Sequence, residues 1–172
     1  MKDDILFYEN QSILKQKILL IVLLPIISLL IWGFIQQVFL NLPFGNKPMS
    51  NVGLSIFVIL FTAISTVFLL SKMETFITEE GIYVKYFPLL LKTKFYSWDN
   101  IQAAYIRKYS PMREFGGWGV KYSFGSGKVY NVYGNRGLQL IFQDGKKILI
   151  GSNRVEELED ILKKLDDKRK QK

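Results

Sequence analysis

The sequence predicts a hairpin of two transmembrane helices followed by an all-β sandwich or small barrel with a C-terminal capping helix. Two apolar runs, 18–35 and 52–70, contain no Asp, Glu, Lys or Arg. From Met73 onward, apolar and polar residues alternate with a period of two, which is typical of strands buried on one face. The last part of the chain returns to the spacing of an amphipathic helix.

The two apolar runs are each close to the ~20 residues that an α-helix needs to cross a ~30 Å hydrocarbon core. We therefore expect a hairpin over 18–70, with spans at about 18–38 and 52–71. In the second span, Ser55, Thr62 and Thr66 share one helical face. This stripe of small hydroxyl residues is expected to pack on the first span, because small residues let two helices approach closely.

Basic residues near the ends of the two runs predict the orientation. Lys15 and Lys17 precede the first run and Lys72 follows the second, whereas the connecting segment contains only Lys47. Because basic residues accumulate on the cytoplasmic side, both termini are expected there, in a multi-pass protein of the cell membrane. The mixed-charge segment 1–17 is expected to be cytoplasmic and to contain a short helix.

A soluble domain is expected over 74–165, and its first strand begins almost directly after the second span. Glu79-Glu80-Gly81 is expected to join the first two strands, and Asp144-Gly145 is typical of the turn in a β-hairpin. The alternating pattern predicts eight strands, at 74–78, 82–87, 94–98, 101–109, 118–124, 128–133, 138–143 and 147–150.

The segment after Gly151 predicts a helix whose apolar stripe covers the sheet. Asn153 is the expected N-cap, and Glu156 is its expected partner in a capping box. Beyond the stripe, 166–172 is a charged tail with no apolar side chain to bury. The stripe consists of Val155, Leu158, Ile161, Leu162 and Leu165.

The composition excludes several kinds of catalytic and metal site. The chain has no Cys and no His, which excludes disulfides, thiolate nucleophiles, histidine acid–base catalysis and zinc sites made of these residues. Gly125-Ser126-Gly127-Lys128 lacks the spacing of a P-loop and lies between two expected strands, so it is interpreted as a hairpin turn. No Ser or Lys has the strand-to-helix context of a nucleophile. We therefore expect no catalytic residue, no metal, no cofactor and no enzymatic activity.

The net charge of +8 indicates an anionic surface as a neighbour. Given the expected hairpin, that surface is the lipid bilayer, with anionic lipid headgroups as a possible ligand, and the alternative is an ordinary solvated basic surface. No basic cluster has the spacing of a nucleic-acid interface, so nucleic acid is not an expected partner.

One segment, 107–121, mixes basic and aromatic residues. Such a mixture suits anionic lipid headgroups, since rings lie at headgroup depth and cations meet phosphates, and it also suits a protein partner. In a third interpretation, the aromatic residues close the sheet and the cations are solvated. The candidate contact residues are Arg107, Lys108, Arg113, Trp118 and Lys121.

Three motifs carry a resemblance to a known family: Tyr96-Ser97-Trp98-Asp99-Asn100-Ile101, the hairpin from Asp144-Gly145 to Gly151, and Glu156-Glu157-Leu158. Together with the layout of the strands, they resemble the pleckstrin-homology-like (PH-like) domains of bacterial membrane proteins, over about 74–165. The resemblance implies a bent sandwich of about seven antiparallel strands closed by one C-terminal helix. One of the eight strands would then be irregular or an extension, and 128–133 is the weakest.

The resemblance implies no catalytic or ligand residues. Phosphoinositide-binding relatives use a basic loop between their first two strands, whereas the loop expected there in this chain, Glu79-Glu80-Gly81, is acidic. Binding in that manner is therefore not expected.

From these features we expect a non-enzymatic, membrane-anchored PH-like module at the cytoplasmic leaflet. It would act as an interaction or assembly domain, through a protein partner or a homo-oligomer. The alternatives are recognition of anionic lipid by 107–121 and a role as accessory subunit of a membrane transporter or enzyme complex.

Overall fold

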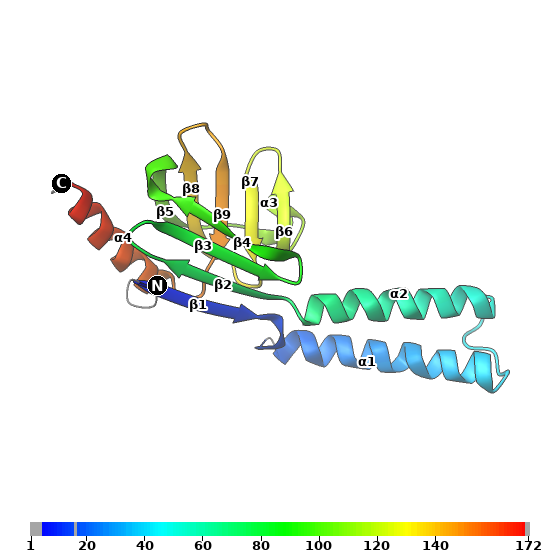
Figure 1. Cartoon of the computed structure of the whole chain (residues 1–172). Helices are drawn as coiled ribbons and strands as arrows, with labels where there is room; N and C mark the ends of the chain where they lie inside the picture. Colours follow the sequence, from blue (N-terminus) through cyan, green and yellow to red (C-terminus); the bar gives the residue numbers. More distant parts are fainter. Residues whose placement is uncertain (1–4, 16, 171–172) are drawn as a thin grey trace. The chain divides into compact units, whose positions relative to one another are not determined.

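The structure is a computed structural model that describes residues 5–15 and 17–170 (Figure 1). Its residue contacts divide the chain into two compact units. One unit combines Met1–Ser12 with Ser71–Lys172, and the other is Ile13–Leu70. The helical unit is thus inserted into the sequence of the β-rich unit, which includes a segment that lies before the domain expected over 74–165.

The helical unit contains two long apolar helices. A short 3-10 helix, η1 (Ile13–Lys15), precedes α1 (Lys17–Phe34), which continues as a π-helical turn, η2 (Ile35–Phe39), and is followed by α2 (Asn51–Leu69). The stretches Leu19–Phe39 and Asn51–Leu69 have a mean hydropathy of 2.5 and are long and apolar enough to cross a membrane.

Most side chains of these two helices lie on the surface of the protein. Only 6% of the first apolar stretch and 17% of the second is buried. Ile21 and Val52, for example, are each 70% exposed. A helix in the core of a soluble domain buries its apolar face, so an exposed apolar surface of this kind is typical of contact with lipid or with another protein.

The hydroxyl stripe of α2 is only partly buried, because Ser55 and Thr62 are half-buried and Thr66 is exposed. Ser55 donates to the carbonyl of Asn51 at 2.7 Å, and Thr66 donates to the carbonyl of Thr62 at 2.8 Å. These hydroxyls therefore bond within their own helix, as Ser and Thr do in apolar surroundings. The buried side chains of α2 are instead Leu54, Val58 and Ser65.

The first sheet of the β-rich unit is antiparallel and has the order β1-β2-β3-β4. Ser12, the last residue of β1, pairs with Lys72, the first residue of β2. The chain therefore leaves the sheet on one strand and returns on the adjacent strand after both helices. The four strands are β1 (Phe7–Ser12), β2 (Lys72–Ile77), β3 (Gly81–Phe87) and β4 (Leu90–Ser97).

The second sheet has the order β5-β8-β9-β7-β6 and is mixed, because β7 runs parallel to β9. The short helices η3 (Trp98–Asn100) and α3 (Pro111–Phe115) flank β5, and α4 (Val155–Lys170) follows β9. Neither sheet closes on itself, so the described residues do not form a barrel. The strands are β5 (Ile101–Lys108), β6 (Gly119–Ser123), β7 (Gly127–Asn131), β8 (Arg136–Phe142) and β9 (Lys147–Gly151).

All eight expected strands are present, with boundaries that differ by a few residues. The strand expected to be weakest, 128–133, is β7, which lies between β6 and β9 inside the second sheet. The N-terminal segment differs from the expectation, because Phe7–Ser12 form β1 and only Ile13–Lys15 are helical.

Polar contacts attach β1 to the end of the second sheet. Glu9 is only 5% exposed and accepts hydrogen bonds from the Ser152 hydroxyl at 2.6 Å and from the Asn153 N–H at 2.9 Å. Gln11 donates from Nε2 to the carbonyl of Gly151 at 2.8 Å. Since buried polar groups need partners, these bonds hold β1 at the junction between β9 and α4.

Helix α4 buries Val155, Leu158 and Leu165, in agreement with the expected stripe. Its start differs from the expected capping box, because the hydroxyl of Ser152, not the side chain of Asn153, accepts a hydrogen bond from the N–H of Arg154 at 3.1 Å. Its end also differs, since the helix continues to Lys170 through most of the expected tail.

Replacing Glu9 tests the attachment of β1. In the full chain, Glu9→Ala should lower the free energy of unfolding by about 1–3 kcal/mol, because two buried donors lose their acceptor. Glu80→Ala, in an exposed turn, is the matched control and should change it by less than about 0.5 kcal/mol. Urea unfolding in mild detergent, followed by circular dichroism, measures both, and equal effects would contradict the role of Glu9.

Candidate functional site

The expected contact segment, 107–121, runs from the end of β5 through α3 to β6. Within the segment, Pro111–Phe115 form the single helical turn α3. Gly116 ends this turn with φ of 68°, a conformation that glycine adopts without strain.

The inner side of the segment belongs to the core. Tyr109 and Phe115 are buried with Val129 and Leu149, and the two rings meet edge to face at 6.1 Å. For these two residues, the interpretation in which aromatic side chains close the sheet is therefore confirmed.

Asn131 of β7 joins the two ends of the segment. Its Oδ1 accepts from the N–H of Gly119 at 2.9 Å, and its Nδ2 donates to the hydroxyl of Tyr109 at 3.0 Å. Burial raises the pKa of the Tyr109 hydroxyl, although the hydrogen bond from Asn131 opposes the shift. The carbonyl of Asn131 also accepts from the Tyr86 hydroxyl at 3.3 Å, so the same residue connects the segment with β3.

Arg107 is held inside the domain. Its Nε donates to Oε1 of Gln139 at 2.9 Å, and its Nη1 lies 2.8 Å from a carboxylate oxygen of Glu114 in α3. About a quarter of each charged side chain in this pair is exposed. Arg107 therefore positions α3 against β5, and its charge is already neutralised by Glu114.

Two further candidate residues also bond within the domain. Lys121 donates from Nζ to the carbonyl of Gly116 at 2.5 Å, at the end of α3. Trp118 is 40% exposed and donates from its indole N–H to the carbonyl of Gly134 at 3.2 Å. Both side chains stabilise the segment while leaving part of their surface accessible.

Lys108 and Arg113 are the candidate contact residues whose side chains stay accessible to lipid or to a partner. Both are exposed, and neither takes part in an ion pair with another residue that the structure describes. Met112, adjacent to Arg113 in α3, is 62% exposed. The segment thus presents two free cations next to an exposed apolar side chain.

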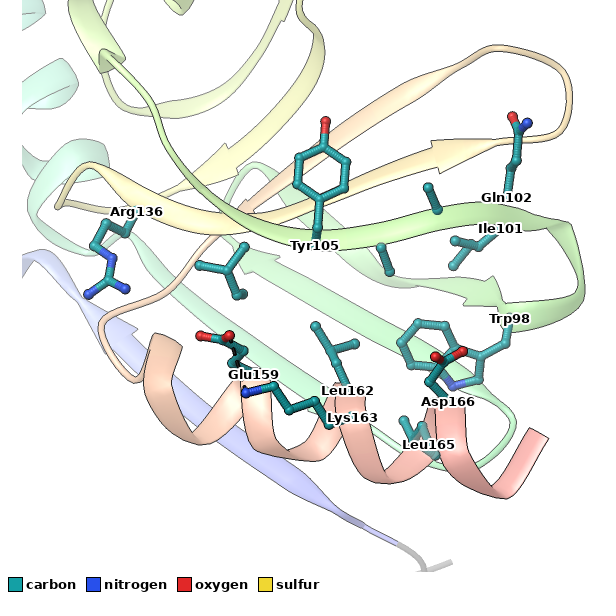
Figure 2. Close-up of a pocket in the computed structure, with 13 residues that line it drawn as sticks. Trp98, Ile101, Gln102, Tyr105, Arg136, Glu159, Leu162, Lys163, Leu165 and Asp166 are labelled. Atoms are coloured by element: carbon teal, nitrogen blue, oxygen red, sulfur yellow. Dashed lines mark ion pairs between the residues drawn. The ribbon is translucent and has the colours of Figure 1, made fainter. Parts of the chain in front are cut away.

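A groove of about 630 Å³ lies between β5 and α4 (Figure 2). Because β5 is the last strand of the second sheet, no other described strand lies beside its outer edge. Ala103 and Ala104 on the strand contribute only methyl groups, which leaves space beside the backbone.

The helix side of the groove combines apolar and charged groups. Figure 2 shows Leu162 and Leu165 on α4 below β5, with Glu159, Lys163 and Asp166 on the same helix. Arg136 lies at one end of the groove and bonds to a carboxylate oxygen of Glu156 at 2.6 Å. A hydrogen bond from the backbone N–H of Glu156 itself, together with this one from Arg136, lowers the pKa of the Glu156 carboxyl.

No known family matches the chain, and neither does any curated protein or solved structure. The geometry of the two sites is therefore the basis for a functional assignment. Among the residues that the structure describes, no group of three acidic residues could hold a metal ion.

Sequence reasoning missed the groove. The sequence predicts a capping helix that covers the sheet, and such a helix leaves no open space between the two elements. The signal that points to the groove is the pair Ala103-Ala104 in an edge strand, since small side chains there leave the strand backbone accessible beside a helix.

Arg107 and Lys108 should respond differently to substitution. Arg107→Gln should lower the free energy of unfolding of the full chain by about 1 kcal/mol, because Glu114 loses its partly buried partner. Lys108→Gln, at the next position of β5, should change it by less than about 0.5 kcal/mol. Thermal unfolding in mild detergent makes the comparison, and equal losses would show that Arg107 has no positioning role.

Proposed function

We propose that this chain is a non-enzymatic, membrane-anchored interaction module, in which two transmembrane helices hold a PH-like domain at the cytoplasmic leaflet of the cell membrane. The observation that carries the proposal is the position of both apolar helices between β1 and β2, two neighbouring strands of one sheet. A domain tethered on two adjacent strands stays at the surface of the membrane that the helices cross.

Hydropathy and charge support the membrane anchor. The apolar side chains of both helices are mostly exposed, and lipid would cover them favourably, at roughly 25 cal/mol for each Å² removed from water. Lys15, Lys17 and Lys72 flank the helices on the side of the domain, against Lys47 in the connection, which favours a cytoplasmic domain.

The strand order supports the PH-like assignment. β1 to β4 form one antiparallel sheet, β5, β8 and β9 are neighbours in the other, and α4 follows β9. These seven strands and the helix agree with the family resemblance if β6 and β7 are an inserted hairpin. The loop between the first two strands is then the helical hairpin instead of Glu79-Glu80-Gly81, so the position at which relatives bind phosphoinositides is occupied by the anchor.

The groove between β5 and α4 is the proposed contact for a protein partner. An exposed strand edge accepts an extended peptide as an additional strand, with main-chain hydrogen bonds for affinity and adjacent pockets for side chains. β5 has such an edge, and Leu162 and Lys163 offer apolar and charged contacts beside it. The partner is a second copy of the chain or another membrane protein, including a transporter or enzyme of which this chain is an accessory subunit.

Crosslinking at the groove tests the partner contact. A photoreactive amino acid in place of Lys163, which lines the groove, should crosslink to a partner when the full chain is illuminated in its native membrane. Lys164, exposed on the same helix and outside the groove, is the matched control and should give no adduct. The mass of the adduct distinguishes a second copy of 20.0 kDa from another protein. No adduct at Lys163, or equal adducts at both positions, would contradict the proposal.

Recognition of anionic lipid by 107–121 is a second candidate function. The observation that favours it is that Lys108 and Arg113 are exposed without an ion pair in the described part of the chain. Each cation near an anionic leaflet contributes about 1 kcal/mol, so two of them change binding by roughly thirtyfold.

Amide exchange of the full chain in nanodiscs tests the lipid contact. The exchange of 109–116 should be slower with anionic than with zwitterionic lipid, and K108Q/R113Q should remove the difference. K163Q/K164Q, on α4, is the control, and this variant should retain the difference in exchange between the two lipids. Exchange that does not depend on lipid charge in the unmodified chain would exclude this function.

A further inference from the structure

An apolar turn joins β3 to β4 in the first sheet. We use this term for Phe87, Pro88, Leu89, Leu90 and Leu91. Phe87 is 38% exposed, Leu89 53% and Leu91 79%. Apolar side chains gathered at the tip of a hairpin add nothing to the core, so their exposure needs another explanation.

The register of the sheet places this turn next to the points where the chain enters and leaves the helices. Phe87 pairs with Lys72 on β2, and Lys72 pairs with Ser12 on β1. β1 ends at Ser12 before the first helix, and β2 begins at Lys72 after the second. Ser12 of β1, Lys72 of β2 and Phe87 of β3 therefore lie at the same end of the first sheet.

The distance between this end of the sheet and helix α2 is limited by the chain itself. Leu70 and Ser71 are the only residues between α2 and β2. At no more than ~3.8 Å between consecutive Cα atoms, Lys72 lies within about 11 Å of the end of α2. Directly opposed residues of neighbouring strands are ~5 Å apart, so Phe87 lies within about 16 Å of the end of α2.

Cations surround the apolar turn. The Nζ of Lys72 lies 5.9 Å from the centre of the Phe87 ring. Lys92 and Lys94, on the strand that follows the turn, are both exposed. An apolar tip bordered by Lys side chains is the arrangement of segments that dip into the interface, where rings and aliphatic groups enter the leaflet and cations meet the headgroups.

We propose that the apolar turn inserts into the cytoplasmic leaflet beside the transmembrane helices and forms a third membrane contact of the chain. This inference rests on the proposed membrane anchor. The bilayer is favoured over a protein as the occupant because the turn shares its end of the sheet with both connections to the helices.

Lipid quenching in the full chain tests the proposal, and the absence of native Cys allows single labels. An environment-sensitive dye is attached to Leu89→Cys, to Phe124→Cys or to Ile59→Cys in nanodiscs that contain nitroxide-labelled lipid. Phe124, in the turn between β6 and β7, is 100% exposed and is the matched control, while Ile59 of α2 reports on the anchor. The nitroxide lipid should quench the Leu89 label at least twofold more strongly than the Phe124 label.

The three labels separate the possible failures. Strong quenching at Ile59 with equal quenching at Leu89 and Phe124 would overturn the insertion of the turn and leave the anchor intact. A blue-shifted Leu89 label that lipid does not quench would place a protein, such as a second copy, on the turn and would also overturn the proposal. An Ile59 label that is not quenched would overturn the membrane anchor and the inserted turn together.

Discussion

The pairing of β1 with β2 is the constraint on which the rest of the structure depends. Because Ser12 lies opposite Lys72, the chain leaves the sheet for the apolar helices and returns from them at the same end of two neighbouring strands. Any membrane that the helices cross as a hairpin then has both ends of the chain on one side. The pairing thus attaches both apolar segments to one particular end of the β-rich unit.

Buried polar contacts make this pairing specific. A strand with only apolar contacts can slide or be replaced by another. Glu9 and Gln11 prevent this, because in any other register the donors of Ser152 and Asn153 and the carbonyl of Gly151 would lose their hydrogen-bond partners. The N-terminal strand is thereby connected to the start of α4, near the C-terminal end of the fold. The helix that forms one wall of the groove is therefore positioned by residues on both sides of the apolar hairpin.

The sequence predicts those parts of the fold that follow a hydrophobic period. The two apolar helices were predictable from the length of their uncharged apolar runs, and the eight strands and α4 from an alternating or helical pattern. β1 was not, because its inward positions include Glu9 and Gln11, so the apolar alternation fails although the strand is regular. The sequence singles out Arg107 as a candidate contact residue, but its partners inside the domain, Gln139 and Glu114, follow only from the tertiary structure. The groove likewise joins segments that are far apart in the chain.

A pair of engineered cysteines measures the β1–β2 pairing most directly, since the chain has no other thiol. Asn10 and Glu74 are directly opposed, and such positions have Cβ atoms close enough for a disulfide. In the full chain in its native membrane, mild oxidation of N10C/E74C should give an intramolecular disulfide between residues 10 and 74, identified by mass spectrometry after proteolysis. N10C/T75C, one residue out of register, should remain reduced. No disulfide in the first variant, or equal oxidation of both, would contradict the account.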